Sequence, residues 1–201
     1  VFTQGASGLG QANAVVAHPT GASSLYFNPA LLNDVPGRQI EFGTTAVFSQ
    51  REVTLDSSGK TDNAEDSWNF PSSLYYTHQA NDRVTAGFGI TFPFGLSNEW
   101  DDTSEGRYLG TYAAMFSMNI NPTVSFRVNE RLSLAAGYDL LYLDTDQRRM
   151  INQTATYLIL GSSLPLPPLA GELNDVEQTF TGDGWGHGFN LGALYKATDR
   201  V

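Results

Sequence analysis

Cysteine is absent from the 201 residues, and basic side chains are scarce. The lack of Cys excludes disulfide frameworks and thiolate metal sites. With 11 Lys and Arg against 21 Asp and Glu, the formal net charge is −10. This charge argues against a nucleic-acid partner, because phosphate binding needs clustered cations. Only 16% of the residues are charged, whereas an ordinary soluble domain carries about a quarter.

Long apolar runs are also missing. No stretch approaches the roughly 18 consecutive apolar residues of a membrane-spanning helix. The most apolar segment, residues 157–170, is interrupted by glycine, serine and three prolines. The chain does not start with a basic segment followed by an apolar core, so we expect a signal peptide to have been removed. A soluble β protein and a transmembrane β-barrel remain as the two alternatives.

Alternation of apolar residues with small polar ones dominates from Arg38 onward. The clearest run covers residues 112–128, where one face is apolar and aromatic and the other carries mostly Ser, Asn and Thr. Soluble strands centre on about five or six residues, whereas a tilted strand needs about 9 to 11 residues to cross a bilayer. We expect antiparallel strands near residues 38–55, 71–80, 84–95, 111–128, 132–148 and 184–197.

Short and long connections alternate between these strands. Tight polar turns of similar sequence lie at Asp82, Glu130 and Asp199, and long connections cover 56–70, 97–110 and 150–183. Short turns at one end and long loops at the other are typical of outer-membrane barrels. A β-sandwich with uneven loops is the alternative explanation.

The first 36 residues show no alternation and are rich in Ala, Gly, Ser and Asn. The pattern predicts short helices, one of them starting at Pro29. Such a segment is too small and polar to fold alone, and inside a barrel it would act as a plug. We therefore divide the chain into an N-terminal plug, residues 1–36, and the first part of a barrel, residues 37–201.

Several motifs in the chain are specific enough to indicate a family. They are Gly-Leu-Gly at 8–10, Asn-Pro-Ala at 28–30, Pro-Phe-Gly-Leu at 93–96, Leu-Ala-Ala-Gly-Tyr at 134–138, and the run at 185–195. Together they resemble the long-chain fatty acid transporters of the FadL family (OmpP1/FadL/TodX), which includes aromatic-hydrocarbon channels. The resemblance covers nearly the whole chain.

The resemblance implies a transmembrane antiparallel β-barrel of 14 strands, with an N-terminal hatch of short helices in its lumen. The chain would supply about six strands, which cannot close, since single-chain barrels start at about eight. We therefore expect a truncated barrel. Further expectations are a Gram-negative outer-membrane location, contact with membrane lipid and lipopolysaccharide, a monomer, and no cofactor or metal.

In the family, loops capture a hydrophobic ligand, which here would be a long-chain fatty acid or a similar molecule. The apolar loop side chains that fit this role are Tyr157, Leu158, Ile159, Leu160, Leu164, Leu166 and Leu169. The alternative is that this loop packs on itself.

The resemblance assigns a carboxylate-binding arginine to Arg149. Arg148 is adjacent and points the other way, so one of the two should face inward. The alternative is two solvated arginines at a strand end.

Gating in the family combines a lateral opening in the wall with a moving hatch. The opening matches Pro93, Phe94 and Gly95, where Pro and Gly weaken a strand. The alternative is that these residues simply end a strand before its loop. The moving part would include Phe2 and the Gly-Leu-Gly motif (Gly8, Leu9 and Gly10). The hatch motif (Asn28, Pro29 and Ala30) is expected near the opening, with Asn28 close to Pro93 or Gly95. The alternative for Asn28 is an ordinary turn former.

Catalysis is not expected. The three histidines lack metal-site spacing. A lipase would need a Ser–His pair, and His187, on the apolar face of its strand, has no flanking serine. A different class of function, a structural or adhesive barrel with acidic loops, remains the rival. The apolar loop at 157–170 argues against it, because an adhesive loop should be polar.

Overall fold

The computed structural model describes residues 5–54, 56, 58–161, 163–164, 167 and 171–198. Most of these residues form antiparallel β-structure. The long strands are β1 (Arg38–Thr44), β6 (Ser72–Gln79), β7 (Val84–Thr91), β9 (Tyr112–Arg127), β10 (Leu132–Ile151) and β11 (Val176–Tyr195). The short strands are β2 (Val47–Ser49), β3 (Glu52–Thr54), β4 (Thr61–Asn63), β5 (Ser67–Asn69) and β8 (Gly95–Glu99).

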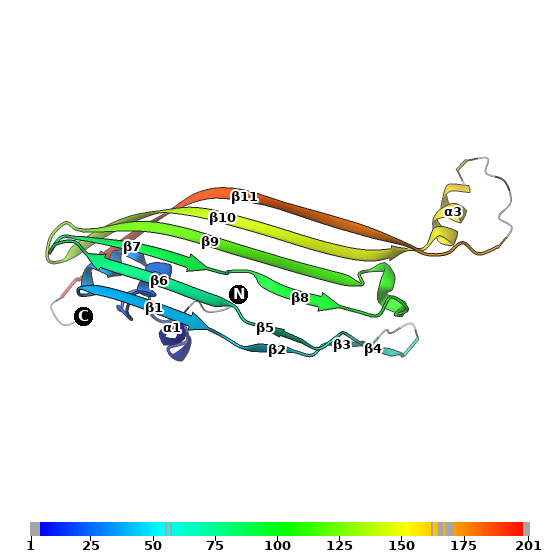
Figure 1. Ribbon diagram of the computed structural model, residues 1–201, viewed down its shortest axis with the longest axis horizontal. Coiled ribbons are helices and arrows are strands. Elements are labelled where there is room, and N and C mark those ends of the chain that lie inside the picture. Colours follow the sequence, from blue (N-terminus) through cyan, green and yellow to red (C-terminus); the bar gives the residue numbers. More distant parts are fainter. Residues whose placement is uncertain are drawn as a thin grey trace.

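The main sheet has the order β1-β6-β7-β9-β10-β11, and β8 continues β7 along β9 (Figure 1). Two short ribbons, β2–β5 and β3–β4, extend the β1–β6 hairpin. The tight turns are closed by asparagine side chains. Asn81 Oδ1 accepts from the backbone N–H groups of Arg83 and Val84 at 2.9 and 3.0 Å, and Asn129 makes the same turn before β10. These Asx turns explain why two short connections share a sequence.

The predicted strands are present, but their bounds differ from the prediction in several places, and the predicted strand 84–95 is divided into β7 and the start of β8. The first predicted strand, 38–55, is broken into β1, β2 and β3, and the predicted connection 56–70 contains β4 and β5. Strand β10 runs to Ile151, and β11 begins at Val176, inside the predicted loop 150–183. That loop also contains a helix, α3 (Gln153–Gly161). The predicted turn at Asp199 lies outside the described residues.

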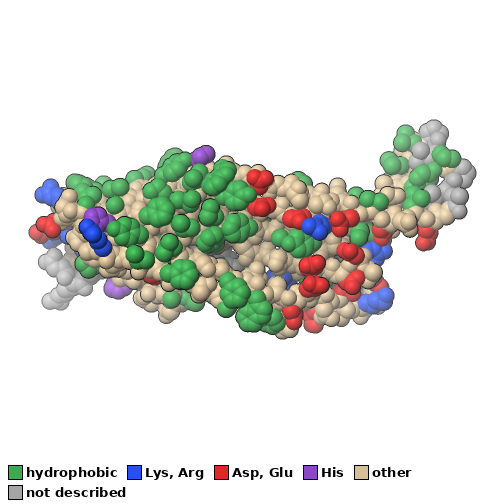
Figure 2. Space-filling model, viewed as in Figure 1, with side chains coloured by type: hydrophobic (Ala, Val, Ile, Leu, Met, Phe, Trp, Pro, Cys, Tyr) green, Lys and Arg blue, Asp and Glu red, His purple; other side chains and the backbone are tan. Residues whose placement is uncertain are grey.

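The burial of the two faces of the sheet is the reverse of that in a soluble protein, because the polar face is buried and the apolar face is exposed. On β9, the buried side chains are small and polar, among them Ser117, Thr123 and Ser125. On the opposite face, the large apolar side chains of Phe116, Val124 and Phe126 are exposed. Figure 2 shows apolar side chains gathered over most of this exposed face, with Asp and Glu concentrated at the end that carries the long loops. An apolar face of this size indicates contact with an apolar environment.

The N-terminal segment, residues 5–37, lies on the polar face, near the end of the sheet that carries the tight turns (Figure 1). It contains α1 (Ala6–Gly10), α2 (Ser24–Phe27) and a 3-10 helix, η1 (Pro29–Asp34), whose N-cap Asn28 accepts from the N–H of Ala30. Its core is Ala22, Leu25 and Leu32, packed with Tyr75 of β6. The segment therefore packs against the wall although it is too small to form a core of its own.

Polar contacts attach this segment to β9 and to the residue that follows β11. Asn33 donates to Ser125 Oγ at 2.7 Å. Asp34 forms ion pairs with Arg127 of β9 at 3.1 Å and with Lys196 at 2.8 Å, directly after β11. Because Asp34 is largely buried, the two cations compensate for its loss of hydration.

None of the helices in the described residues is long and apolar enough to cross a membrane.

Candidate functional site: a wall break, an inner pocket and the outer loops

The wall is interrupted between β7 and β8. Strand β7 ends with Thr91 opposite Asn119, whereas β8 resumes with Gly95 opposite Phe116. Three residues of one strand therefore face two of the other, which is a β-bulge. Ser117 closes the bulge, because its N–H donates to the Phe94 carbonyl and its Oγ accepts from the Phe94 N–H, both at 2.8 Å. A break at Pro93, Phe94 and Gly95 was predicted, and it is present.

On the side of β7–β8 that faces β6, the ladder of backbone hydrogen bonds is also lost. Pairing of β6 with β7 stops at Ser73 and Thr91, and the two sides next meet at the isolated bridge of Ala64 with Trp100. Between these points lies a pocket of about 510 Å³. Its lining is Asn69, Phe70, Pro71, Ser72, Phe92, Gly95, Leu96, Ser97, Tyr112, Ala114, Met115, Phe116, Asp144 and Asp146. We call this the wall pocket.

A second pocket, of about 360 Å³, lies on the polar face between α2 and strands β7 to β11. We call it the inner pocket. Leu25, Tyr26 and Phe27 of α2 form one side of it, and Asp139 of β10 lies on the other. Thr91, the last residue of β7 before the bulge, also lines it. The inner pocket therefore reaches the edge of the wall break.

Asn28 does not lie where the sequence suggested. Its Nδ2 donates to the carbonyl oxygens of Val16 at 3.0 Å and Ala193 of β11 at 3.1 Å. By the register, Ala193 stands level with Phe126 of β9, ten residues from Phe116, which is opposite Gly95. Ten residues of strand are about 33 Å.

The expectation that Asn28 lies close to Pro93 or Gly95 is therefore wrong. The hatch motif instead contacts β11, because a Cβ on Gly192 would stand 2.7 Å from Asn28 Oδ1 and 2.9 Å from Pro29 Cγ. Only a glycine at this position allows the two backbones to approach so closely.

The two predicted arginines lie on opposite faces of β10. The register of β10 with both neighbours is constant from Leu140 to Arg148, so residues of the same parity share a face. Arg149 thus shares the face of Asp139, and its Nε donates to Gln178 Oε1 at 2.7 Å. Arg148 is on the outer face, where it forms an ion pair with Asp146 at 2.6 Å.

Four of the predicted apolar loop residues, Tyr157 to Leu160, lie in the helix α3, which projects beyond the sheet (Figure 1). Asn152 caps it by accepting from the N–H of Ala155 at 2.7 Å. Leu158 and Ile159 are 61% and 71% exposed, and Leu160 and Leu164 are also exposed. The loop partly packs on itself, since the Tyr157 hydroxyl donates to the Pro167 carbonyl at 2.6 Å. Leu166 and Leu169 lie outside the described residues.

Of the residues predicted to move with the hatch, three belong to α1. Gly8 is buried against the Phe27 ring, whereas Leu9 is exposed. A Cβ on Gly10 would meet nothing within 4 Å. Phe2 lies outside the described residues.

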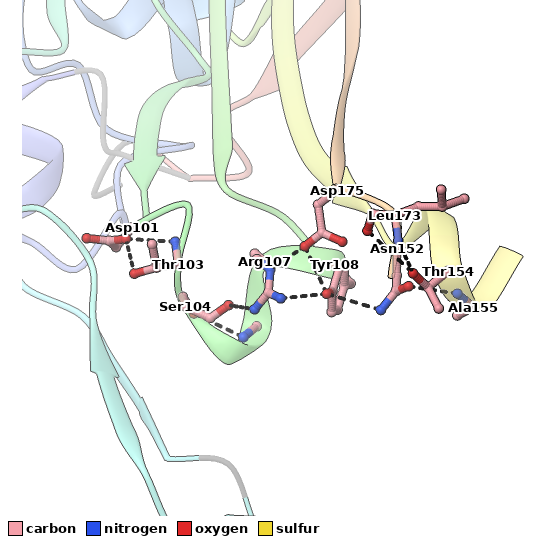
Figure 3. A network of polar contacts seen from close by, with 11 residues as sticks. Asp101, Thr103, Ser104, Arg107, Tyr108, Asn152, Thr154, Ala155, Leu173 and Asp175 are labelled. Atoms are coloured by element: carbon pink, nitrogen blue, oxygen red, sulfur yellow. Dashed lines mark hydrogen bonds and ion pairs between the residues drawn. The ribbon is translucent and has the colours of Figure 1, made fainter. Parts of the chain in front are cut away.

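A polar network that the sequence analysis missed joins the outer loops (Figure 3). Arg107 forms an ion pair with Asp175 at 2.8 Å, and its guanidinium lies 4.3 Å from the Tyr108 ring centroid. The Tyr108 hydroxyl donates to Asp175 at 2.9 Å and accepts from Asn152 at 3.2 Å. The hydrogen bond from Arg107 lowers the pKa of Asp175 below its ordinary value. The network holds the loop after β8 against both ends of the connection between β10 and β11, Asn152 at one end and Asp175 at the other. We call this connection the α3 loop.

This arrangement defines a class of protein. A meander of long antiparallel strands, apolar outside and polar inside, with an N-terminal segment attached to its inner face, is typical of an outer-membrane transport protein. Over residues 1–201 the chain matches the family described as "Outer membrane protein transport protein (OMPP1/FadL/TodX)". The chain belongs to this family, whose members are transport channels of the Gram-negative outer membrane.

Individual relatives agree with this assignment. The chain is 28% identical over 200 residues to the long-chain fatty acid transport protein of Salmonella typhi, covering 94% of this chain and 45% of the relative. It spans about half the length of the curated relatives that it matches at this coverage. Its fold resembles that of a Pseudomonas aeruginosa FadL homologue, with a TM-score of 0.81 at 20% identity, over 100% of this chain and 50% of the homologue. It also resembles the Ralstonia pickettii toluene transporter TbuX, with a TM-score of 0.63 at 18% identity, over 89% and 50%.

Proposed function

We propose that the protein is an outer-membrane channel for the uptake of long-chain fatty acids or other hydrophobic molecules. Residues 1–36 form its hatch, and residues 37–201 form the first part of a barrel that has 14 strands in the family. The protein works without catalysis, cofactor or energy source, as a monomer in contact with outer-membrane lipid and lipopolysaccharide.

The proposed path begins at the outer loops. The exposed apolar side chains of α3 capture the ligand, and Arg149 receives a carboxylate where one is present. The ligand then moves to the inner pocket beside the hatch and leaves sideways through the wall pocket into the bilayer. The alternative function, an adhesive barrel with acidic loops, is disfavoured because α3 exposes apolar rather than polar side chains.

The hatch has to shift for the ligand to pass. We place this movement in the Gly-Leu-Gly motif and Phe2, where glycine permits backbone states closed to other residues. Asn28, Pro29 and Ala30 hold the hatch on β11 instead of closing the opening, since the hydrogen bond of Asn28 to Ala193 attaches the motif there.

The wall break is the observation that carries this proposal. Pairing of β6 with β7 stops at Ser73 and Thr91 and is followed only by the isolated bridge of Ala64 with Trp100. Within lipid, a strand edge without a ladder is tolerated only where it lines a cavity. The wall pocket is such a cavity, with Phe92 and Phe116 in contact across it at a ring-centroid distance of 5.7 Å. The lining of this passage is largely apolar, although Asp144 and Asp146 also belong to it, and a largely apolar passage suits a ligand that partitions into the membrane.

Deleting Pro93 tests the proposal. The deletion removes the extra residue, so that β7 and β8 share one register with β9 and the wall can close. Uptake of radiolabelled oleate by cells without another such channel should fall to background. The matched control is Pro93→Ala, which keeps the bulge and should keep uptake.

Both variants must reach the membrane as folded barrels, as judged by their heat-dependent migration on gels. Full uptake by the folded deletion variant would contradict lateral exit.

A further inference from the structure

The inner pocket contains a carboxylate in a path proposed for hydrophobic cargo. Asp139 is its only Asp, Glu, Lys or Arg among the described lining residues. The side chain lies on the same face as Ser133 and Ala135, which are buried. A charge in such a place needs a reason, because loss of hydration is costly.

Asp139 holds the donors of three asparagines. The Nδ2 groups of Asn119 and Asn121 donate to its Oδ1, and that of Asn190 donates to its Oδ2, each at 2.9 Å. Asn121 Oδ1 accepts from Thr123 at 2.8 Å. The Oδ1 atoms of Asn119 and Asn190 are buried and have no hydrogen-bond partner in the part of the chain that the structure describes.

The cluster therefore presents a negative charge and two acceptors that are unpartnered within the described residues. Asn121 uses both N–H groups of its amide, on Asp139 and on the Tyr138 carbonyl, and Asn119 and Asn190 each direct one N–H to Asp139. An incoming carboxylate needs a cation or donors to replace its water. A hydroxyl or a protonated carboxyl needs an acceptor, and a hydrocarbon needs neither.

Three cations placed above, Arg127, Lys196 and Arg149, do not relieve this situation. Arg127 and Lys196 are paired with Asp34. Arg149 shares the face of Asp139 but stands ten residues along β10, which is about 33 Å. Repulsion between Asp139 and a second carboxylate in the inner pocket is therefore uncompensated by these groups.

We infer that Asp139 is a charge filter that admits hydrophobic molecules with an uncharged head and disfavours carboxylates. The inference rests on the proposed function, in which cargo passes the inner pocket on its way to the wall break. Thr91 lines the pocket beside that break, so cargo leaving through the wall passes Asp139. Hydrocarbons, alcohols and protonated acids fit this site, and an ionised acid captured outside has to take up a proton before it passes.

Two ligands of equal chain length test the filter, laurate and lauryl alcohol. Initial uptake rates are measured with the intact protein in cells without another such channel, at a pH at which laurate is ionised. Rates of cells lacking the protein are subtracted. The wild-type protein should favour the alcohol by at least tenfold, equivalent to about 1.4 kcal/mol.

Asp139→Asn should raise the rate of laurate relative to the alcohol by about tenfold and leave the alcohol rate unchanged. Asp139→Glu keeps the charge and should keep the wild-type ratio. The matched control is Asp183→Asn. It removes a carboxylate of β11 that lies on the face of the sheet opposite to Asp139, and it should also keep the wild-type ratio.

Other outcomes separate the two proposals. If the wild-type protein takes up neither ligand, the proposed function fails. If it takes up both and ionised laurate is as fast as the alcohol, the filter is refuted even where Asp139→Asn does not fold. An equal change of both rates in folded Asp139→Asn would make Asp139 a residue that shapes the pocket and would also refute the filter.

Discussion

Replacing Gly87 by alanine should loosen the N-terminal segment from the wall. A Cβ at this position of β7 would stand 2.6 Å from Leu25 Cδ1 and 2.7 Å from Leu32 Cδ1. Leu32 is fully buried and Leu25 nearly so, so neither side chain can move aside without shifting the segment. Overpacking of this kind costs about 1–3 kcal/mol, equivalent to about a 5- to 150-fold change in an equilibrium constant.

Amide hydrogen exchange of η1 in the folded protein measures this effect, because local opening of the segment sets the exchange rate. Exchange should accelerate by the stated factor in Gly87→Ala. Gly95→Ala adds the same methyl group where nothing lies within 4 Å, and it should leave η1 unchanged.

A second substitution tests the cause. Leu25→Ala alone should destabilise the segment by about 2–5 kcal/mol, but it also removes one of the two overlaps. The free-energy cost of the double variant should therefore be smaller than the sum of the two single costs, by about 1 kcal/mol or more. Unchanged protection of η1 in Gly87→Ala, or strict additivity in the double variant, would refute the close approach of Leu25 to β7.

Three other changes have expected outcomes. Acidification should release the outer loops, because Arg107 lowers the pKa of Asp175; the ion pair contributes above the ordinary value of about 4 and is lost as the pH falls through the lowered pKa. Hydrogen exchange in the α3 loop should show this, with a weaker pH dependence in Asp175→Asn. Arg149→Ala should weaken fatty acid binding about 10- to 100-fold, since a charge-assisted hydrogen bond contributes about 1.5–3 kcal/mol. Binding of a neutral hydrocarbon should be unaffected, and equal loss for both ligands would make the arginine structural. Asn28→Ala removes hydrogen bonds to two carbonyls and should accelerate exchange of η1 about tenfold, whereas an unchanged rate would show that these bonds do not hold the segment.

The strands were predictable because their signals are local. Alternation assigns each residue to a face, and an Asx turn is encoded in the residues of the turn itself, as at Asn81 and Asn129. The break at Pro93 was predictable for the same reason, since proline cannot donate to a ladder. The extra residue of the bulge was not, because it is defined only by the register with Ser117 on another strand.

The position of the hatch motif could not be derived locally. Asn28 contacts Ala193 across 165 residues of sequence, and the motif itself encodes only the turn and the start of η1. Its proposed neighbour was assigned by resemblance. The residue that could have indicated the contact is Gly192, whose missing side chain permits it. Other glycines of the same strand, Gly186 and Gly188, alternate with larger residues in the same way, so the sequence did not single out Gly192.

The ends of the α3 loop were misjudged for a related reason. Residues 176–183 form strand because β10 continues opposite them as far as Ile151, not because their own alternation is strong. Helix α3 begins at a capping asparagine, Asn152, within a run that the sequence analysis treated as irregular because of the prolines after it.

The ladder of β9, β10 and β11 has a mechanical consequence. Every residue of β10, from Leu132 to Ile151, has a partner on β11. The β1–β8 side is interrupted after Thr44, before Ser72 and after Thr91. When the surrounding bilayer thins or thickens, the uninterrupted strands will resist bending, and the deformation will concentrate at the interruptions. The two halves of this wall thus differ in stiffness, and membrane tension would widen the compliant half while the rigid half keeps its shape.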